Sequence, residues 1–200
     1  MKHKVLKLVS TIVLGLALAS CGPKAFVKGQ YDDVERENLM NDQWSETDMQ
    51  VAVKSMVDSM VMHSAIANAK KLPTVIVTNL QNKTSEHVDT QSITDMFQVE
   101  LMRSGKVTFV DKAAREDIAE EYDYQDSGMV NRETKKGKGG QVGADFIMNG
   151  RLDSIVQEAG KDKTIYYKLT MNLTNLKTGL IQWTDHKQLR KQYKKKRVGI

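Results

Sequence analysis

The chain has 200 residues, of which 30 are Lys or Arg and 25 are Asp or Glu, so its formal net charge is +5 at neutral pH. Cysteine occurs once and proline twice, which excludes a disulfide-rich scaffold and a proline-rich disordered protein. The chain is long enough for one domain with its own hydrophobic core.

The first twenty residues have the layout of a bacterial export signal. Three lysines, Lys2, Lys4 and Lys7, precede an apolar run from Leu8 to Ala19. About twelve residues at about 1.5 Å each are too few to cross a hydrocarbon core of about 30 Å as a helix. We therefore predict that residues 1–20 are a signal peptide and not a permanent membrane span.

The only cysteine follows this run directly. The stretch Leu18-Ala19-Ser20-Cys21 resembles the lipobox of bacterial lipoproteins, in which the cysteine is lipidated and becomes the mature N-terminus. We predict a diacylglycerol and an N-linked acyl chain at Cys21, with no other cofactor. The alternative is an ordinary signal followed by a free thiol, which is a liability in an oxidising compartment. By the enteric sorting rule, an aspartate directly after the lipidated cysteine retains a lipoprotein in the inner membrane. This position is Gly22, which favours an outer-membrane anchor facing the periplasm.

The positive charge is concentrated at the C-terminus. Without the three lysines of the signal, 27 basic and 25 acidic residues remain, and seven of the basic ones lie within residues 187–200. The rest of the mature chain is mildly acidic, which is not typical of a nucleic-acid-binding protein. The basic tail could attract anionic lipid, an acidic partner or the cell wall, or be a solvated chain end. As candidates for partner contact we name Arg190, Lys191 and Lys194.

The mature chain divides into a tether and a domain. Residues 22–44 are polar and without periodicity, so we expect a lipidated flexible tether over residues 21–45 and a single globular domain over residues 46–200. A capping-box-like pair, Ser45 and Asp48, begins a stretch with apolar residues at helical spacing. This stretch predicts a helix from about residue 46 to 68.

The next third predicts a βαβ unit. The β-branched run TVIVTNL after Pro73 indicates a buried strand, and a helix starting at Asp89 or Thr90 stops at Ser104-Gly105. The run KVTFVD then indicates a second strand, parallel to the first with a right-handed crossover. Residues 112–124 are expected to be helical, and a short helix is expected around residues 131–137.

The last third predicts an antiparallel meander. Three long strand candidates, DFIMNGRLDSIVQEA, KTIYYKLTMNLTNL and LIQWTDHKQLRKQY, are joined by turns at residues 159–162 and 177–179. In the middle strand apolar and polar residues alternate from Ile165 to Thr174, so one face is packed and the other is polar. The expected fold class is α/β or α+β, with a mixed sheet of about five strands and helices packed on it.

The sequence gives little support for a metal-binding, phosphate-binding or catalytic site. The three histidines of the mature chain are isolated in the sequence, which gives little support for a zinc site. The glycine-rich run KKGKGGQVGAD lacks the Ser or Thr that must follow Lys138 in a phosphate-binding loop. The acidic pairs Glu116/Asp117 and Glu120/Glu121 could serve acid-base chemistry, although on a helix facing water they more readily provide solubility.

Three segments resemble a known family. They are WSETDMQVAVKSMVDSM from Trp44, VDTQSITDMFQVELMRSGKVTFVD from Val88 and GQVGADFIMNGRLDSI from Gly140, in the order seen in LpoB-like lipoproteins. The resemblance runs from about Trp44 to Trp183. It implies a TolB N-terminal-like fold, no enzymatic activity, and activation of a class A penicillin-binding protein, the bifunctional peptidoglycan synthase, by a monomeric lipoprotein. CsgG-like secretion lipoproteins share that fold and are the alternative, although such pore-formers need an extra pair of amphipathic strands.

The tether departs from the enterobacterial pattern, which is long and proline-rich. Residues 22–45 are 24 residues with one proline. Fully extended they reach at most about 80 Å at roughly 3.3 Å per residue. As a flexible coil they average about 25 to 30 Å from end to end. The length of this tether limits where a partner in the envelope can be met.

Overall fold

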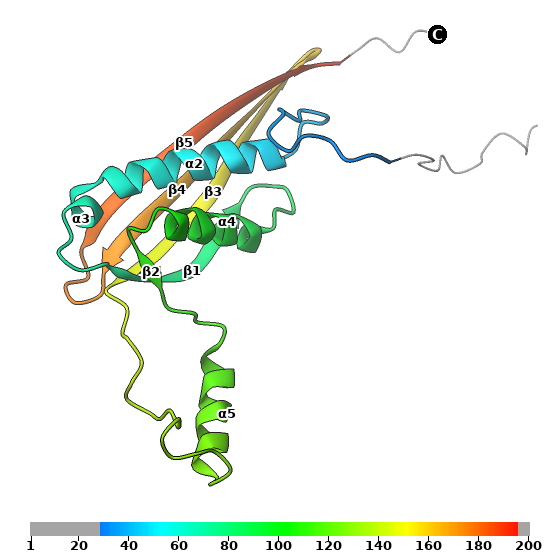
Figure 1. The fold of residues 1–200 in the computed structure, drawn as a ribbon. Helices are drawn as coiled ribbons and strands as arrows, with labels where there is room; N and C mark the ends of the chain where they lie inside the picture. Colours follow the sequence, from blue (N-terminus) through cyan, green and yellow to red (C-terminus); the bar gives the residue numbers. More distant parts are fainter. Residues whose placement is uncertain (1–28, 196–200) are drawn as a thin grey trace, which may run out of the picture. The chain divides into compact units, whose positions relative to one another are not determined.

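The computed structural model describes residues 29–195 (Figure 1). The chain divides into two units, Met1–Glu35 and Arg36–Ile200, and the described residues of the first unit form no helix or strand. The second unit, which we call the folded domain, holds every helix and strand found within residues 29–195. Its helices are α2 (Glu46–Met62), α3 (Ser64–Ala67), α4 (Thr90–Arg103) and α5 (Arg115–Asp126), and its strands are β1 (Thr74–Lys83), β2 (Thr108–Phe109), β3 (Phe146–Ala159), β4 (Asp162–Asn175) and β5 (Ile181–Lys194).

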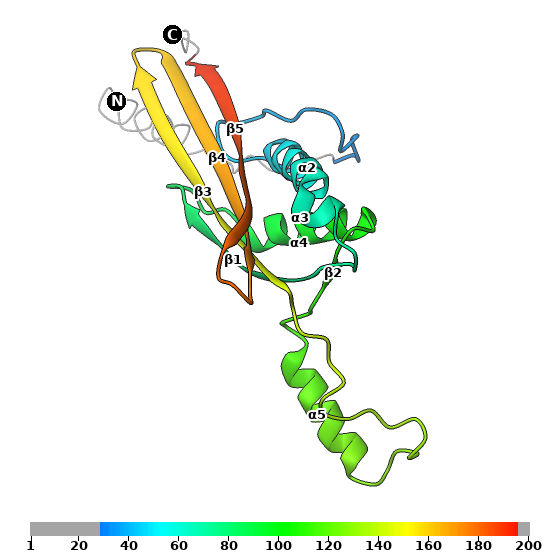
Figure 2. The same cartoon turned by 90° about the vertical axis from the view of Figure 1, so that its left-hand side faces the viewer.

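One mixed sheet organises the folded domain. Its strand order is β2-β1-β3-β4-β5, so β2 and β5 are the edges. Strand β1 pairs in parallel with both β2 and β3, whereas β3, β4 and β5 pair antiparallel. Helices α2 and α4 lie on the same side of the sheet (Figures 1 and 2). The expected five-stranded mixed sheet, with a βαβ unit and a C-terminal meander, is confirmed.

The core lies between this helix layer and one face of the sheet. Alternate residues of β4 from Ile165 to Leu173 point into it, and each of them is at most 1% exposed. Helices α2 and α4 contribute methionines and a phenylalanine that fill the space above the strands. The largest fully buried side chains include Met56, Met60, Phe97, Met148, Leu152, Tyr167, Leu169, Met171 and Leu173. Met56 and Met60 of α2 are therefore core residues, whereas Met49 is partly buried against the core and Met62 is exposed.

Helix α2 begins as the sequence predicts and ends earlier. The Ser45 hydroxyl accepts a hydrogen bond from the Asp48 amide, and the Asp48 carboxylate accepts one from the Ser45 amide, which forms a capping box. The predicted helix over residues 46–68 breaks at His63, whose backbone is extended. The His63 ring accepts a hydrogen bond from the Ala65 amide, and this contact starts the separate short helix α3.

The segment between β2 and β3 differs most from expectation. Strand β2 has only two residues, and α5 covers Arg115–Asp126 without a buried side chain. The expected helix around residues 131–137 is wrong, because only turns form there. This part of the chain has few apolar residues, so it lacks the burial that stabilises a short helix in a protein.

The meander contains one glycine that the packing requires. Gly150 of β3 pairs with Met171 of β4, and a Cβ at Gly150 would lie 2.2 Å from the Thr170 carbonyl oxygen and 2.5 Å from the Met171 sulfur. Any side chain at this position would therefore push β3 and β4 apart. The turn at Gly160, with φ of +60°, then links the two strands as a tight hairpin.

Candidate functional site: the strap and the open sheet face

The segment that precedes α2 is attached to the sheet. We call residues 38–44 the strap. The Asn38 amide donates to the Thr47 hydroxyl at 2.9 Å, and the Trp44 amide donates to Glu86 Oε2 at 2.7 Å. The Tyr193 hydroxyl donates to the Asn41 carbonyl. The expectation of a flexible tether up to residue 45 therefore does not hold for the strap, because side chains from β4, β5 and the loop after β1 bind it.

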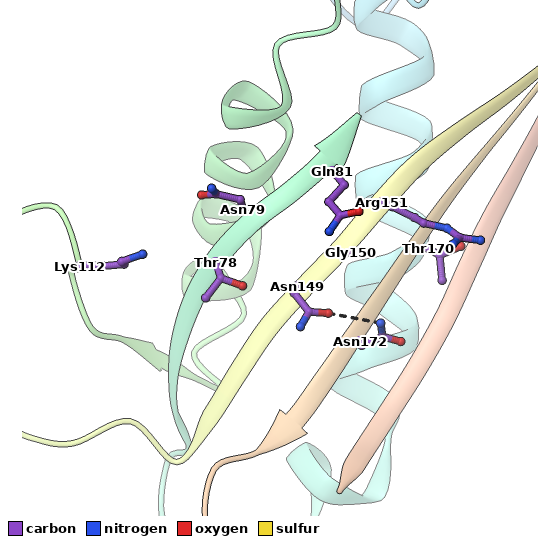
Figure 3. Close-up of a pocket in the computed structure, with 9 residues that line it drawn as sticks. All are labelled: Thr78, Asn79, Gln81, Lys112, Asn149, Gly150, Arg151, Thr170 and Asn172. Carbon is purple, nitrogen blue, oxygen red and sulfur yellow. Dashed lines mark hydrogen bonds between the residues drawn. The ribbon is translucent and has the colours of Figure 1, made fainter. Parts of the chain in front are cut away.

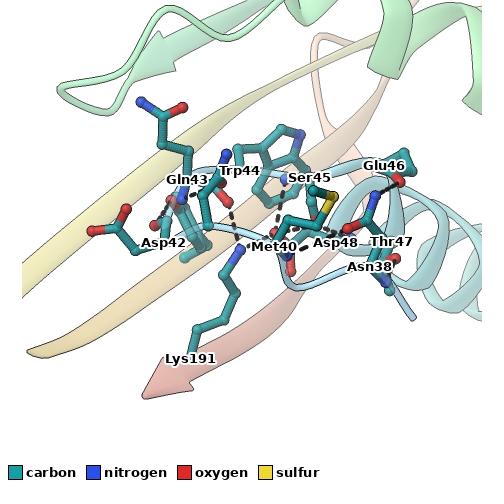
Figure 4. A network of polar contacts seen from close by, with 12 residues as sticks. Asn38, Met40, Asp42, Gln43, Trp44, Ser45, Glu46, Thr47, Asp48 and Lys191 are labelled. Atoms are coloured by element: carbon teal, nitrogen blue, oxygen red, sulfur yellow. Dashed lines mark hydrogen bonds and ion pairs between the residues drawn. The ribbon is translucent and has the colours of Figure 1, made fainter. Parts of the chain in front are cut away.

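A buried ion pair lies beneath the strap. Lys191 Nζ of β5 is 2.8 Å from Asp48 Oδ2 of α2, and both side chains are only 6% exposed. The same ammonium group donates to the Gln43 carbonyl in the strap (Figure 4). Since Asp48 also caps α2, one carboxylate connects the helix start, the edge strand and the strap. Burial of such a pair is tolerated only because its hydrogen-bonding groups are matched.

Aromatic rings complete this cluster. Lys191 Nζ lies 5.7 Å from the centre of the Tyr167 ring, which is close enough for a cation–π contact. The Trp44 ring meets the Tyr167 ring edge to face, with centroids 5.2 Å apart. The Tyr167 hydroxyl donates to Glu86, the same carboxylate that accepts the Trp44 amide. The cluster therefore fixes the point at which the chain enters the folded domain.

An outer ion pair supports the strap at a more exposed position. Lys163 of β4 pairs with Asp42 of the strap and with Glu158 of β3. The hydrogen bond from Lys163 lowers the pKa of Asp42, and the same bond raises the pKa of Lys163. Both side chains are partly exposed, so solvent screens this pair and its contribution to stability is small.

The strap should open more easily when its ring contact is removed. Trp44→Ala loses the edge-to-face contact with Tyr167, which contributes about 0.5–1.5 kcal/mol beyond the area that it buries. We expect the amides of residues 38–44 to exchange with deuterium about tenfold faster, as a decrease of about 1.4 kcal/mol in opening free energy would give. Met40→Ala is the control, because Met40 is 90% exposed and should leave the exchange unchanged. Equal exchange in the two variants would contradict the role given to Trp44.

Tyr167 should make stability depend on alkaline pH. Burial, followed by the Glu86 carboxylate, raises the pKa of Tyr167 above its ordinary value of 10.0. Above pH 10 the unfolded chain loses a proton that the folded chain keeps, so this contribution is complete below pH 10 and decreases as the pH rises. We expect the free energy of unfolding to fall by about 1.4 kcal/mol per pH unit from this group.

The measurement is urea unfolding at several pH values between 9 and 11 on the wild type and on Tyr167→Phe. Lys163, whose pKa is also raised, acts in the same direction, so the difference between the two slopes isolates Tyr167. A slope that is identical in the two proteins would show that Tyr167 ionises as easily in the folded state as in the unfolded state.

The three basic residues named for partner contact lie on opposite faces of β5. Lys191 points into the domain and is buried, so it is not available to a partner, and that expectation is wrong for this residue. Arg190 and Lys194 are exposed on the other face. Residues 187–194 belong to the edge strand and not to a separate tail. Successive residues of β5 point to opposite faces of the sheet, which explains why Lys191 is buried and Arg190 and Lys194 are exposed. The sequence indicated the buried face, because the apolar residues Trp183 and Leu189 share it with Lys191.

The sheet face opposite the helices is polar and open. We call it the open face. A hollow of about 520 Å³ lies on it, lined by Thr78, Asn149 and Thr170 from three adjacent strands (Figure 3). Asn172 donates to Asn149 at 3.3 Å and accepts from Thr184 at 2.7 Å, so amide and hydroxyl groups are linked from strand to strand.

The described part of the chain offers no cluster of metal-binding side chains. Within residues 29–195 no group of three or more His, Cys, Asp or Glu side chains could hold a metal ion. Glu116 and Glu120 are exposed on α5. The Ser59 hydroxyl donates to Asp185 and accepts from the Trp183 indole at 3.3 Å, which joins α2 to β5. Cys21 lies outside the described residues, and among those described no helix is long and apolar enough to cross a membrane.

Comparison with known proteins identifies the family. A family model described as peptidoglycan-synthase activator LpoB matches residues 48–189. No curated protein matches the chain. Similar solved structures include the LpoB C-terminal domain from Salmonella enterica, with 15% identity, a TM-score of 0.43, and coverage of 71% of this chain and 98% of that one.

Two further structures are similar over comparable lengths. The NMR structure of E. coli LpoB has 17% identity and a TM-score of 0.40, and the match covers 88% of this chain and 85% of that one. The lipoprotein GNA1162 from Neisseria meningitidis has 13% identity and a TM-score of 0.41, with 60% and 83% covered.

The matched range begins in α2, at the buried carboxylate of Asp48, and ends in β5, so it includes all or most of each of the five strands and of both core helices. It also contains the three segments from which the resemblance was inferred, apart from the four residues before Asp48. Because this range is more than two thirds of the sequence, the chain belongs to the LpoB family of peptidoglycan-synthase activators.

Proposed function

We propose that this protein is an outer-membrane lipoprotein that binds a class A penicillin-binding protein and stimulates its synthesis of peptidoglycan. The observation that carries the proposal is the family match over residues 48–189. The protein acts as a monomeric regulator without an enzymatic activity of its own. Stimulation requires that it bind the more active conformation of the synthase more tightly than the less active one.

The anchor in this proposal is lipid at Cys21, and the strap shortens the reach of the tether. Only residues 22–37 lie between the anchor and the strap, which is 16 residues. Fully extended they span about 53 Å at about 3.3 Å per residue, and as a flexible coil they average about 20–24 Å. The synthase must therefore offer its docking region close to the membrane that holds the lipid.

The test is an assay of glycan polymerisation by class A synthases from the same organism, with and without the purified full-length lipoprotein in detergent. We expect at least one synthase to bind the protein and to consume its lipid-linked substrate several times faster. If none binds and none speeds up, the proposal fails. Size-exclusion chromatography of the same preparation tests whether the protein is a monomer.

A variant separates anchoring from activation. Cys21→Ala removes the proposed lipid site but leaves the folded domain as it is. We expect this variant to stimulate the synthase in detergent as well as the wild type does, and to lose its function in cells because it is no longer held at the membrane. Full function of Cys21→Ala in cells would contradict the role of the lipid anchor.

A further inference from the structure

The open face is a polar surface to which the proposed function assigns no role. Helices α2 and α4 cover the other side of the sheet, and α5 buries none of its side chains. Along β4 the alternate residues from Thr164 to Asn172 all point to the open face and are half-buried. The eight steps from Thr164 to Asn172, at about 3.3 Å each, make this row about 26 Å long.

The row connects two hollows. The first, of about 520 Å³, includes Thr170 and Asn172, and the second, of about 650 Å³, includes Thr164, Tyr166 and Lys168. Both volumes lie within the range of ligand sites. Because all five residues belong to one face of one strand, the two hollows follow each other along β4, and we call them together the groove.

Most side chains that line the first hollow carry an amide or a hydroxyl group. Figure 3 shows Asn149 and Asn172 side by side on adjacent strands, with Thr78 and Gln81 from β1 beside them. The bond from Asn172 to Asn149 occupies one donor and one acceptor, and the bond from Thr184 occupies another acceptor site. Each amide still has an NH₂ proton and lone pairs for a ligand. The linked side chains are held in place before a ligand arrives, which reduces the entropy lost on binding.

This chemistry fits a sugar polymer better than a protein partner. Sugar hydroxyls donate and accept hydrogen bonds, as amide and hydroxyl side chains do, and the Tyr166 ring offers an apolar surface beside them. A stable protein interface instead has an apolar centre rich in aromatic side chains. In the two hollows the only aliphatic side chain is Ile155, and Tyr166 is the only aromatic ring.

The charge of the groove is positive. Lys112 and Arg151 line the first hollow, and Lys168 and Arg190 line the second, whereas no carboxylate lines either one. Arg151 pairs with Asp153 at 3.0 Å, so part of its charge is matched already. We propose that the open face binds a glycan strand that carries carboxylate groups, with the sugars along β4 and the carboxylates near these four cations. This site does not depend on contact with a synthase.

The first experiment measures binding without any synthase. The full-length protein in detergent is titrated with soluble peptidoglycan strands of defined length that retain their peptide stems. The test variant is Asn149→Ala/Asn172→Ala, which removes the linked amides together and leaves neither without its partner. We expect its dissociation constant to rise at least tenfold, with an unchanged melting temperature.

A matched control removes two amides that lie elsewhere. Gln50 is on α2, and Gln141 is on the loop after α5. Gln50→Ala/Gln141→Ala should bind the strands as the wild type does. The proposal is overturned if the wild type does not bind the strands, or if both double variants bind them equally well.

Charge is tested with variants whose folding is not at risk. Lys112 and Arg151 are exposed, so Lys112→Gln/Arg151→Gln should fold normally. We expect this variant to bind stem-bearing strands about tenfold more weakly, and strands whose carboxylates have been converted to neutral amides as well as the wild type does. Equal loss for both kinds of strand would remove the assigned role of the carboxylates and overturn that part of the proposal.

Synthase binding by the same variants distinguishes a glycan site on the open face from a protein-docking surface. If Asn149→Ala/Asn172→Ala no longer binds the synthase while no form of the protein binds glycan, the open face is a protein interface and the proposal is overturned. If glycan binding depends on the amides while no synthase is stimulated, the glycan site stands and the proposed activator function fails.

Discussion

Lys191→Met is expected to lower the free energy of unfolding by about 3–5 kcal/mol, because it leaves the Asp48 carboxylate buried without its charge partner. The substitution keeps most of the side-chain volume, so the loss reflects the charge and the hydrogen bonds and not a cavity. Urea unfolding followed by circular dichroism measures it. Lys194→Met on the exposed face of the same strand is the control, with an expected change within about 0.5 kcal/mol.

A second variant distinguishes an unpaired charge from lost packing. Lys191→Met/Asp48→Asn removes both charges and keeps an acceptor oxygen for the Ser45 amide at the start of α2. We expect the double variant to be more stable than Lys191→Met alone, because no buried charge is left without a partner. A cost below about 1 kcal/mol for Lys191→Met, or a double variant that is less stable than the single one, would contradict this explanation.

Gly150→Ala is expected to lower the free energy of unfolding by about 3 kcal/mol or more, which is the upper end of the range for overpacked cores. The loss is large because the added methyl group clashes with the backbone of the neighbouring strand. For a chain of this size that loss corresponds to a decrease of about 6–12 °C in melting temperature. The methyl group would meet the Thr170 carbonyl oxygen at 2.2 Å, and a paired strand cannot yield as a flexible side chain can.

The matched substitution is Gly143→Ala, in the loop before β3. A Cβ there has no atom within 4 Å, and the backbone conformation is not left-handed. Thermal unfolding of this variant should be unchanged or shifted slightly upward, because alanine restricts the unfolded chain more than glycine does. Similar melting temperatures for Gly150→Ala and Gly143→Ala would show that β3 and β4 can separate at little cost.

Most of the sheet could be predicted from local patterns. Alternation along β4 identified the buried face from Ile165 to Leu173, and all of those apolar residues are at most 1% exposed. Asp89 and the left-handed Gly105 bounded α4 correctly, because caps are local features of the backbone. The helix expected around residues 131–137 lacked such support, since it had neither a cap pair nor an apolar stripe.

The strap could not be predicted, because its contacts are far apart in the sequence. Lys191 lies 143 positions after Asp48, and Tyr167 lies 81 positions after Glu86. Residues 38–44 are polar and without periodicity, so their sequence alone indicates a flexible tether. Such a segment becomes ordered only when a surface formed by distant residues binds it. The same limit applies to the basic C-terminus, where charge alone did not show that Lys191 is buried while Arg190 is exposed. The amide-lined hollow was missed for the same reason, since its residues come from three strands, β1, β3 and β4, and from Lys112 in the loop after β2.

The inward position of Lys191 affects how readily copies of the protein can stack through the edges of their sheets. Strand β5 is an edge of the sheet with 14 residues, and an edge of this length is a template on which another copy could add its own strand. A charged side chain that points inward from an edge strand, with further lysines along the same edge, makes such stacking unfavourable. Copies that the proposed lipid anchor would hold at one membrane surface would meet far more often than free ones do. The buried ammonium group would thus keep neighbouring copies from polymerising through their edges, at the same time as it holds the strap.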